Sequence, residues 1–228
     1  MEKYNISVDI HEAYRYMGCH GKPDDSIENE LKNAAALIKA HAAPRVIKKI
    51  CDIDNADGIS LKGTNLKLDG QAIAALLHDC ELCAIFCATI GNDIEGLIRK
   101  WQLKDLAFAS MLDACASSAV ESLCDSVENE LKQEYGAQGL HLTDRFSPGY
   151  GDLPLSIQPD FCAALDTARK IGVSVSESGI MIPRKSVTAI IGLSKFPQKH
   201  FNNGCQDCGL KAACKFRENG VTCYGQAI

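Results

Sequence analysis

The sequence predicts an α+β protein, with a mostly antiparallel twisted sheet flanked by helices and a short cysteine-rich C-terminal tail. Residues 80–90 and 187–193 are apolar runs of strand length, which indicates buried strands. The segments between the expected strands vary in length, and this disfavours the regular strand–helix repeat of a doubly wound sheet. The composition changes near residue 203, so we expect one domain over 1–203 and a separate tail over 204–228.

The other elements follow from periodicity and from helix-capping residues. Residues 8–18 and 25–41 have helical patterns, with Asp9 and Asp25 as the expected N-caps. The helix expected over 105–135 carries many small residues in its first half, so another element should approach it closely. The remaining expectations are a strand at 46–51, a hairpin at 58–69, helices at 71–78, 92–101 and 159–171, and extended pieces at 173–175 and 180–182.

Length and charge restrict the class of protein. A chain of 228 residues forms one large domain or two small ones and buries a substantial core. The net charge is −5, from 24 basic and 29 acidic residues, which argues against broad nucleic-acid binding. We find no apolar run near the roughly 20 residues of a membrane span and no secretion signal. We therefore expect a cytoplasmic protein with neither nucleic acid nor membrane as a partner.

Twelve cysteines are the unusual feature of the composition. Cys80, Cys83 and Cys87 have the spacing C-x2-C-x3-C, which suggests an iron–sulfur centre. They lie within an apolar run, however, and free cysteine is among the most buried residue types, so we interpret them as core residues. The same structural interpretation applies to the scattered cysteines, which are Cys19, Cys51, Cys115, Cys124 and Cys162.

The tail contains four cysteines of a different kind. Cys205, Cys208, Cys214 and Cys223 have the spacing C-x2-C-x5-C-x8-C, and the residues between them are mostly polar or small. Hydrophobic burial does not explain such cysteines, whereas four nearby thiolates can surround one metal centre. We expect a [4Fe–4S] cluster first and structural zinc second, because sequence alone does not separate them. Two disulfides or a disordered reducing tail are the alternatives.

Residues 145–154 (RFSPGYGDLP) form a stiff loop that carries polar side chains. Its prolines and glycines exclude a regular helix or central strand, while Arg145, Tyr150 and Asp152 are long or charged. Polar groups fixed on a stiff backbone are typical of a small-molecule site, although an ordinary surface turn has the same composition. No Ser–His–Asp arrangement, P-loop or G-x-G-x-x-G motif is present, and the histidines lack metal-ligand spacing.

Two segments resemble the activation (reactivation) domain of cobalamin-dependent methionine synthase. Residues 145–150 (RFSPGY) are similar to the R-x-x-P-G-Y signature of that family. Residues 171–187 (IGVSVSESGIMIPRKSV) are similar to its G-x-x-L-T-E-S-x-A-M-x-P-x-x-S-V segment. The positions of Thr89–Gly91 and Glu121 also agree with the family. The resemblance covers roughly residues 5–200.

This resemblance implies a methionine synthase activation component that binds S-adenosylmethionine. Such a domain presents the methyl donor to a cobalamin on its partner whose cobalt is in the inactive Co(II) state, and one electron permits the methylation. By position, Arg145 would hold the ligand carboxylate, and Glu121 would face its ammonium or sulfonium. Pro148, Gly149 and Tyr150 would shape the loop against the adenosine, and Glu177 and Ser178 would support the site or contact the ligand.

The sequence departs from the family at three places. The segment after Tyr150 lacks the family's C-P-x-H pattern, His200 and Phe201 replace an aromatic pair, and Asp9 matches an N-terminal acidic position only loosely. The chain is expected to act on the corrinoid-binding domain of a separate methionine synthase or related methyltransferase, with an electron donor such as flavodoxin or ferredoxin. The alternatives are a non-catalytic corrinoid-protein partner and an iron–sulfur redox or regulatory protein.

Overall fold

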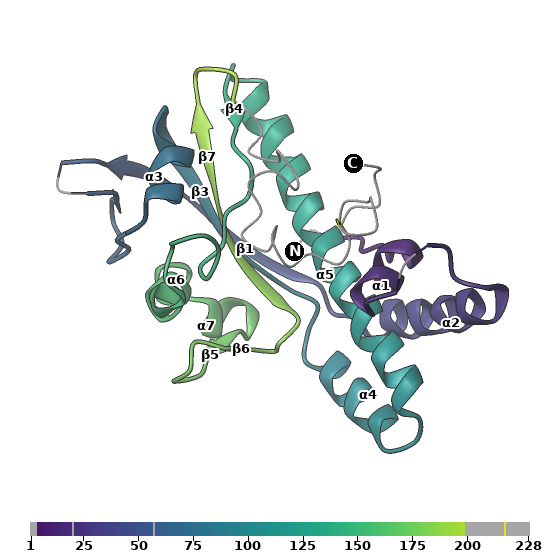
Figure 1. Ribbon diagram of the computed structural model, residues 1–228. Coiled ribbons are helices and arrows are strands. Elements are labelled where there is room, and N and C mark those ends of the chain that lie inside the picture. The colour runs from purple at the N-terminus through teal and green to yellow at the C-terminus, as the bar shows by residue number, and fades with distance from the viewer. Residues whose placement is uncertain (1–3, 20, 57, 199–216, 218–228) are drawn as a thin grey trace.

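The structure, a computed structural model, describes residues 4–19, 21–56, 58–198 and Arg217 (Figure 1). Its elements follow one another as α1 (Ile10–Tyr16), α2 (Asp25–His41), β1 (Arg45–Asp54), β2 (Ser60–Leu61), α3 (Gln71–Leu77), β3 (Cys80–Thr89), α4 (Asp93–Gln102), α5 (Leu106–Gly136), β4 (His141–Leu142), a 3-10 turn (Leu155–Ile157), α6 (Gln158–Leu165), α7 (Thr167–Ile171), β5 (Ser174–Val175), β6 (Met181–Ile182) and β7 (Ser186–Ser194).

Five strands form an antiparallel sheet in the order β2-β1-β3-β7-β4, and β5 and β6 form a separate antiparallel pair. Helices α1, α2, α4 and α5 lie on one side of the sheet, and α3, α6 and α7 lie on the other (Figure 1). The predicted α+β class, with an antiparallel sheet flanked by helices, is therefore confirmed over the part of the chain that the structure describes.

Strand β3 is buried on both of its faces. Phe86 and Ala88 belong to the core under α1, α2, α4 and α5, while Ile85 and Cys87 belong to the core under α3, α6 and α7. Successive side chains of a strand point to opposite faces, so a strand covered on both sides needs apolar residues at every position. This explains why the sequence shows a continuous apolar run here instead of an alternating one.

Helix α5 is the central helix of the larger core. Asp105 caps it by accepting a hydrogen bond from the backbone N–H of Phe108 at 3.0 Å. The N-terminal segment crosses its small residues: Asp9 N–H donates to Ser118 Oγ, and Ser7 N–H donates to Ser122 Oγ, each at 2.9 Å. The close approach predicted from the small residues of this helix is thus confirmed. By length and composition α5 could cross a membrane, but more than half of its most apolar stretch is buried inside the protein.

Two local predictions were wrong. The N-cap of α2 is Asp24, whose carboxylate accepts from the N–H of Ile27 at 2.8 Å, and Asp25 is the first helical residue. The expected single helix over 159–171 is divided into α6 and α7, because Asp166 adopts a left-handed backbone conformation with φ 56°. Sequence patterns do not readily decide which of two neighbouring acidic residues caps a helix. They also give little signal for a helix break at a residue other than glycine.

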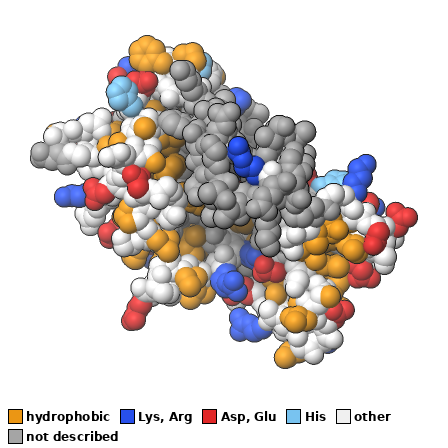
Figure 2. Space-filling model, viewed as in Figure 1, with side chains coloured by type: hydrophobic (Ala, Val, Ile, Leu, Met, Phe, Trp, Pro, Cys, Tyr) orange, Lys and Arg blue, Asp and Glu red, His pale blue; other side chains and the backbone are white. Residues whose placement is uncertain are grey.

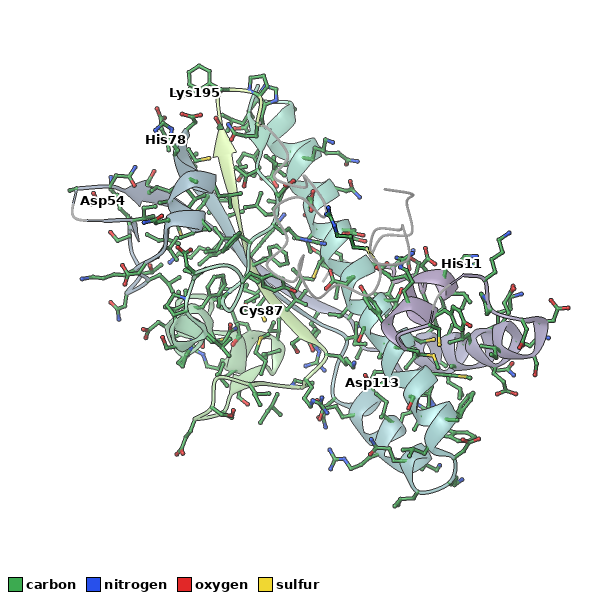
Figure 3. The ribbon with its side chains drawn as sticks, in the orientation of Figure 1. His11, Asp54, His78, Cys87, Asp113 and Lys195 are labelled. Atoms are coloured by element: carbon green, nitrogen blue, oxygen red, sulfur yellow. The ribbon has the colours of Figure 1, made fainter. Side chains whose placement is uncertain are left out.

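The structure describes eight of the twelve cysteines, and seven of these are buried. Cys83 and Cys87 have no exposed surface, so their predicted core role is confirmed, and Cys87 lies on the α6–α7 side of the sheet (Figure 3). Burial raises the pKa of Cys80 to about 11. No group of three or more potential metal ligands occurs among the described residues. Cys205, Cys208, Cys214 and Cys223 lie outside them, so the predicted metal centre remains a prediction.

Candidate ligand-binding site

The loop that follows β4 is anchored on β7. Phe146 and Ile190 exchange two backbone hydrogen bonds, at 2.9 and 2.8 Å. The chain then turns at Gly149, which has φ 91° and donates its N–H to the carbonyl of Leu153 at 2.9 Å. Glycine adopts this left-handed conformation at little cost, so the backbone folds tightly directly before Tyr150.

Asp152 has a structural role in this loop. Its carboxylate accepts hydrogen bonds from the N–H groups of Gln71 and Ala72, at 2.6 and 3.1 Å, and so caps the start of α3. These backbone hydrogen bonds lower the pKa of Asp152. A Cβ atom on Gly70 would lie 2.6 Å from Asp152 Oδ1, so the close approach requires glycine there. The segment after Tyr150, which departs from the family pattern, thus joins the loop to α3.

The second predicted segment is fixed at its C-terminal end against β3. Ser186 Oγ donates to the carbonyl of Pro183 and is 2.9 Å from Thr89 Oγ1, which in turn accepts from the N–H of Gly91 at 3.2 Å. This network joins the segment Thr89–Gly91 to Ser186, and both belong to the segments on which the sequence resemblance rests.

Leu155 brings the two motifs side by side. A Cβ atom on Gly149 would lie 3.6 Å from Leu155, and one on Gly179 would lie 3.3 Å from it. Both glycine turns therefore pack on the same side chain. As a result, the loop over 145–150 and the β5–β6 hairpin form two walls of one site.

We call the cavity between these walls the loop cleft. It has a volume of about 440 Å³ and contains four of the predicted ligand contacts, Glu121, Arg145, Pro148 and Tyr150. The remaining lining residues are Asp144, Ser147, Leu155, Gln158, Gly179, Met181, Ser186, Val187 and Thr188.

Three predicted contacts lie outside this lining. Gly149 turns the backbone beside the cleft, and Glu177 and Ser178 occupy the exposed turn between β5 and β6. Ser178 Oγ lies 2.9 Å from Ser176 Oγ. The part of this turn that lines the cleft is formed by Gly179 and Met181. The ligand contacts of Glu177 and Ser178 remain predictions.

Arg145 lies against a row of carboxylates on α5. Its guanidinium nitrogens are 3.2 Å from Glu121, 2.9 Å from Asp125 and 3.7 Å from Glu128. These acidic positions are four and three residues apart and therefore share one helix face. The sequence predicted separate ligand contacts for Arg145 and Glu121, whereas the structure pairs them with each other.

The electrostatic balance around Arg145 is acidic. Burial raises the pKa of Glu121 and of Glu128; Arg145 opposes the shift, and Asp125 adds to it. Three carboxylates face one guanidinium, so at neutral pH the group has an excess of negative charge. Such a site favours a ligand that carries positive charge.

A second cavity, which we call the helix cleft, adjoins the first. It has a volume of about 1060 Å³ and shares Glu121 and Tyr150 with the loop cleft. On one wall Lys185 Nζ contacts Asp113 Oδ1 at 2.9 Å and Ser117 Oγ at 2.8 Å. The other lining residues come mainly from α1, α4 and α5 and are Tyr16, Met17, Ile98, Gln102, Leu106, Ala107, Ala109, Ser110, Ala114, Val120 and Arg184.

Asp113 lies on α5 beside α4 (Figure 3). Hydrophobic side chains are exposed at the surface near α4 and the start of α5, where Leu103 is 91% exposed and Leu106 is 69% exposed (Figure 2). One edge of the helix cleft is therefore apolar.

The additional predicted contacts have separate outcomes. The carboxylate of Asp9 caps α1 by accepting from the N–H groups of His11 and Glu12, and Asp9 lines neither cleft. His200 and Phe201 lie outside the described residues. Sequence reasoning missed the acidic partners Asp125 and Glu128, although their spacing from Glu121 could have indicated them. It also missed Gln158, Thr188 and Lys185, which have no recognisable sequence signal.

Comparison with known proteins supports the fold. The sequence matches no protein-family model and no curated protein. Among solved structures, the chain is similar to a crystal structure of the MetH reactivation domain bound to AdoHcy. The TM-score is 0.61 at 13% sequence identity, and the match covers 94% of this chain and 84% of the other. The structure thus confirms, at the level of the fold, the resemblance to the methionine synthase reactivation domain that the two sequence motifs indicated.

Proposed function

We propose that this protein binds S-adenosylmethionine in the loop cleft and supports reductive methylation of a Co(II) corrinoid on a separate methionine synthase or corrinoid methyltransferase. One observation carries the proposal. The two motifs that resemble the reactivation domain, 41 residues apart from Arg145 to Ser186, form the walls of one cavity over Glu121. The similar solved domain, with the same fold, is bound to AdoHcy.

The charge of the cleft suits a methyl donor. S-adenosylmethionine carries a sulfonium, an ammonium and a carboxylate, so its net charge is positive near neutral pH. Glu121 lies at the junction of both clefts and supplies negative charge for the cationic part of the ligand. The bound ligand itself supplies the transferable methyl group, and the protein's residues bind and orient it.

Arg145 has two tasks in this proposal. Its guanidinium holds the acidic row of α5 in place, through Glu121, Asp125 and Glu128. It also binds the ligand carboxylate, for which five N–H donors in a planar fork are well suited. Because α5 carboxylates already occupy part of the fork, a ligand carboxylate displaces or shares one of these contacts.

The helix cleft is the proposed approach of the corrinoid-binding domain. It shares the lining residues Glu121 and Tyr150 with the loop cleft, so a partner bound there is placed next to the ligand. Small side chains of α5, such as Ala107 and Ser110, leave this wall open. The required electron comes from a donor such as flavodoxin or ferredoxin.

Calorimetry with S-adenosylmethionine tests the ligand, and recovery of methylated corrinoid from the Co(II) form tests the activity. We expect saturable binding and recovery by the wild-type protein, and loss of both in Arg145→Ala. Arg169→Ala is the matched control, because Arg169 is exposed and, among the described residues, forms an ion pair only with the nearby Asp166. Absence of wild-type binding, together with an unchanged corrinoid reaction in Arg145→Ala, would contradict the proposal.

A non-catalytic corrinoid-protein partner is the second candidate. The contacts between Arg145 and three carboxylates favour it, since a guanidinium so engaged binds a ligand carboxylate less readily. This candidate predicts a complex with a corrinoid protein whose affinity does not change when S-adenosylmethionine is added. A measurable change in affinity favours the first function.

For the tail we propose a metal centre on Cys205, Cys208, Cys214 and Cys223, either a [4Fe–4S] cluster that relays the electron or structural zinc. The other cysteines support this assignment indirectly, because burial accounts for nearly all those that the structure describes. Anaerobic purification followed by metal and sulfide analysis tests it. Iron with sulfide supports a relay, or an iron–sulfur redox or regulatory protein; zinc excludes the relay, and no metal contradicts the centre.

A further inference from the structure

The edge of β7 opens into the loop cleft at Thr188. On one side of β7, Thr188 stands opposite Cys87 of β3. On the other side, Ile190 exchanges both of its backbone hydrogen bonds with Phe146. Alternate residues of an antiparallel strand direct their backbone groups to alternate sides. The N–H and C=O of Thr188 therefore point as those of Ile190 do, away from β3.

Pro148 ends the ladder of hydrogen bonds on that side. Counting from the pair of Phe146 and Ile190, Pro148 would stand opposite Thr188. Proline has no backbone N–H and cannot continue the ladder. No backbone or side-chain group in the described part of the chain bonds to the N–H or C=O of Thr188. Thr188 is only 2% exposed, and buried backbone groups normally have partners.

Gln158 adds a second polar group at the same place. It is the first residue of α6 and is 2% exposed, yet it lines the loop cleft. Its side-chain Nε2 donates to Thr188 Oγ1 at 2.7 Å, which fixes the carboxamide beside the strand edge. Within the described ranges, no residue donates to its Oε1. The amide oxygen of Gln158 and the backbone donor–acceptor pair of the buried Thr188 thus lie at one cavity.

Apolar side chains line the same cleft as these polar groups. Pro148, Leu155, Met181 and Val187 line the cleft, and Tyr150 lies at its edge with 68% of its surface exposed. Apolar walls with a few fixed polar groups at one edge are typical of a pocket for a flat heteroaromatic ring. The charged residues Glu121, Asp144 and Arg145 lie before Pro148 in the chain or on α5, and are left for the amino-acid part of a ligand.

We propose that the backbone of Thr188 and the carboxamide of Gln158 select a 6-aminopurine base. Adenine presents an acceptor nitrogen next to an exocyclic amino donor, which matches an N–H donor beside carbonyl oxygens. Hypoxanthine has a carbonyl and a ring N–H in these positions, so its pattern is reversed. Sites built to hydrogen-bond a group discriminate strongly against analogues that leave their polar atoms unpaired. The inference rests on the proposed nucleoside ligand and assigns its specificity.

Competition binding by S-adenosylhomocysteine and S-inosylhomocysteine tests this assignment, because the two probes differ only in the base. We expect the wild-type protein to prefer the adenine compound by roughly 10–100-fold. Gln158→Met keeps the length of the side chain and should reduce that preference to within about threefold, with the loss confined mainly to the adenine compound. Gln133→Met, on the exposed face of α5, is the control and should keep the full preference.

Thr188→Val provides a second variant that keeps the backbone and the side-chain shape. It removes the hydroxyl that fixes Gln158, so the preference should fall to a value between those of the wild type and Gln158→Met. Equal binding of both probes by the wild-type protein, or full discrimination by a folded Gln158→Met, overturns the inference but leaves the proposed function intact. Failure of the wild type to bind either S-adenosylmethionine or S-adenosylhomocysteine overturns both.

Discussion

The two clefts share Glu121 and Tyr150 but are built in different ways. The loop cleft is walled by the backbone of a tight turn, a hairpin and a strand edge, and its charged centre has three carboxylates around one arginine. The helix cleft is more than twice as large, and in it Lys185 and Asp113 form a one-to-one ion pair. The smaller cleft has an excess of negative charge, whereas the larger one is locally neutral.

We propose that this difference divides two tasks: the loop cleft selects the small-molecule ligand, and the helix cleft receives the partner protein. Fixed backbone groups and unbalanced charge discriminate between small molecules, because each polar atom of the ligand must find a partner. A broad surface of small residues with paired charges makes few demands on shape and suits a second protein.

Removal of the ligand carboxylate should have the largest effect. If Arg145 binds that group, the wild-type protein should bind S-adenosylmethionine about 10–100-fold more tightly than its decarboxylated analogue, the range for hydrogen bonds to a charged group. Arg145→Ala should abolish this preference. Calorimetry with both compounds measures it, with Arg169→Ala as control. Equal binding by the wild type would restrict Arg145 to organising the acidic residues of α5.

Acidic pH should weaken binding of the positively charged ligand. Burial raises the pKa of Glu121, so this carboxyl takes up a proton at a higher pH than an ordinary glutamate. From pH 7 to pH 5 we expect the affinity for S-adenosylmethionine to fall by up to about tenfold. The affinity for S-adenosylhomocysteine, whose sulfur is uncharged, should change less. Glu121→Gln should remove the pH dependence, and a dependence that persists in this variant would contradict the role of Glu121.

The raised pKa values of Glu121 and Glu128 should also make the stability of the folded protein depend on pH. A carboxyl whose pKa is higher in the folded protein than in the unfolded chain favours folding below its unfolded pKa, and this contribution is lost as the pH rises through the folded pKa. Glu121 and Glu128 should therefore stabilise the folded protein at acidic pH relative to neutral pH. Urea titrations of Glu128→Gln and the wild type at both pH values measure this contribution.

In the helix cleft, Lys185→Met should affect stability and leave ligand binding unchanged. Lys185 has 12% of its side chain exposed and contacts Asp113 and Ser117, so we expect a loss of about 1–2 kcal/mol in the free energy of unfolding. Lys195→Met, which breaks an exposed pair with Glu81, should cost less than about 0.5 kcal/mol. A large decrease in nucleoside affinity in Lys185→Met would show that the clefts are not separate in function.

Asp152→Ala should have the smallest effect. It removes the cap of α3 and so should lower the Tm slightly, with no change in ligand affinity, because Asp152 lines neither cleft. Asp160→Ala, at an exposed position of α6, serves as the control in the thermal melts. A decrease in affinity without a change in Tm would place Asp152 in the ligand site after all.

Much of the fold could be predicted from the sequence because its elements have strong local signals. The apolar run of β3, the small residues of α5 and the cap at Asp9 each indicate their structure within a short window. The loop cleft was located because Arg145 and Tyr150 belong to a recognisable motif. The edge of the cleft that offers hydrogen bonds could not be located in this way. Gln158 and Thr188 come together only because of the alternation of residues along β7 and the packing of α6 against the sheet. The split at Asp166 depends likewise on one backbone conformation.

The burial of most described cysteines determines which thiols of the native protein a reagent can modify. Thiolate, not thiol, reacts with alkylating reagents, and burial raises the pKa of Cys115 and Cys124 to about 12 while excluding the reagent. Cys19 is the only one of the eight described cysteines with partial exposure. A timed alkylation of the native protein, read by mass spectrometry, should therefore modify Cys19 and leave the seven buried thiols unmodified. If the cysteines of the tail react only after a chelator is added, a bound metal is what protects them from the reagent.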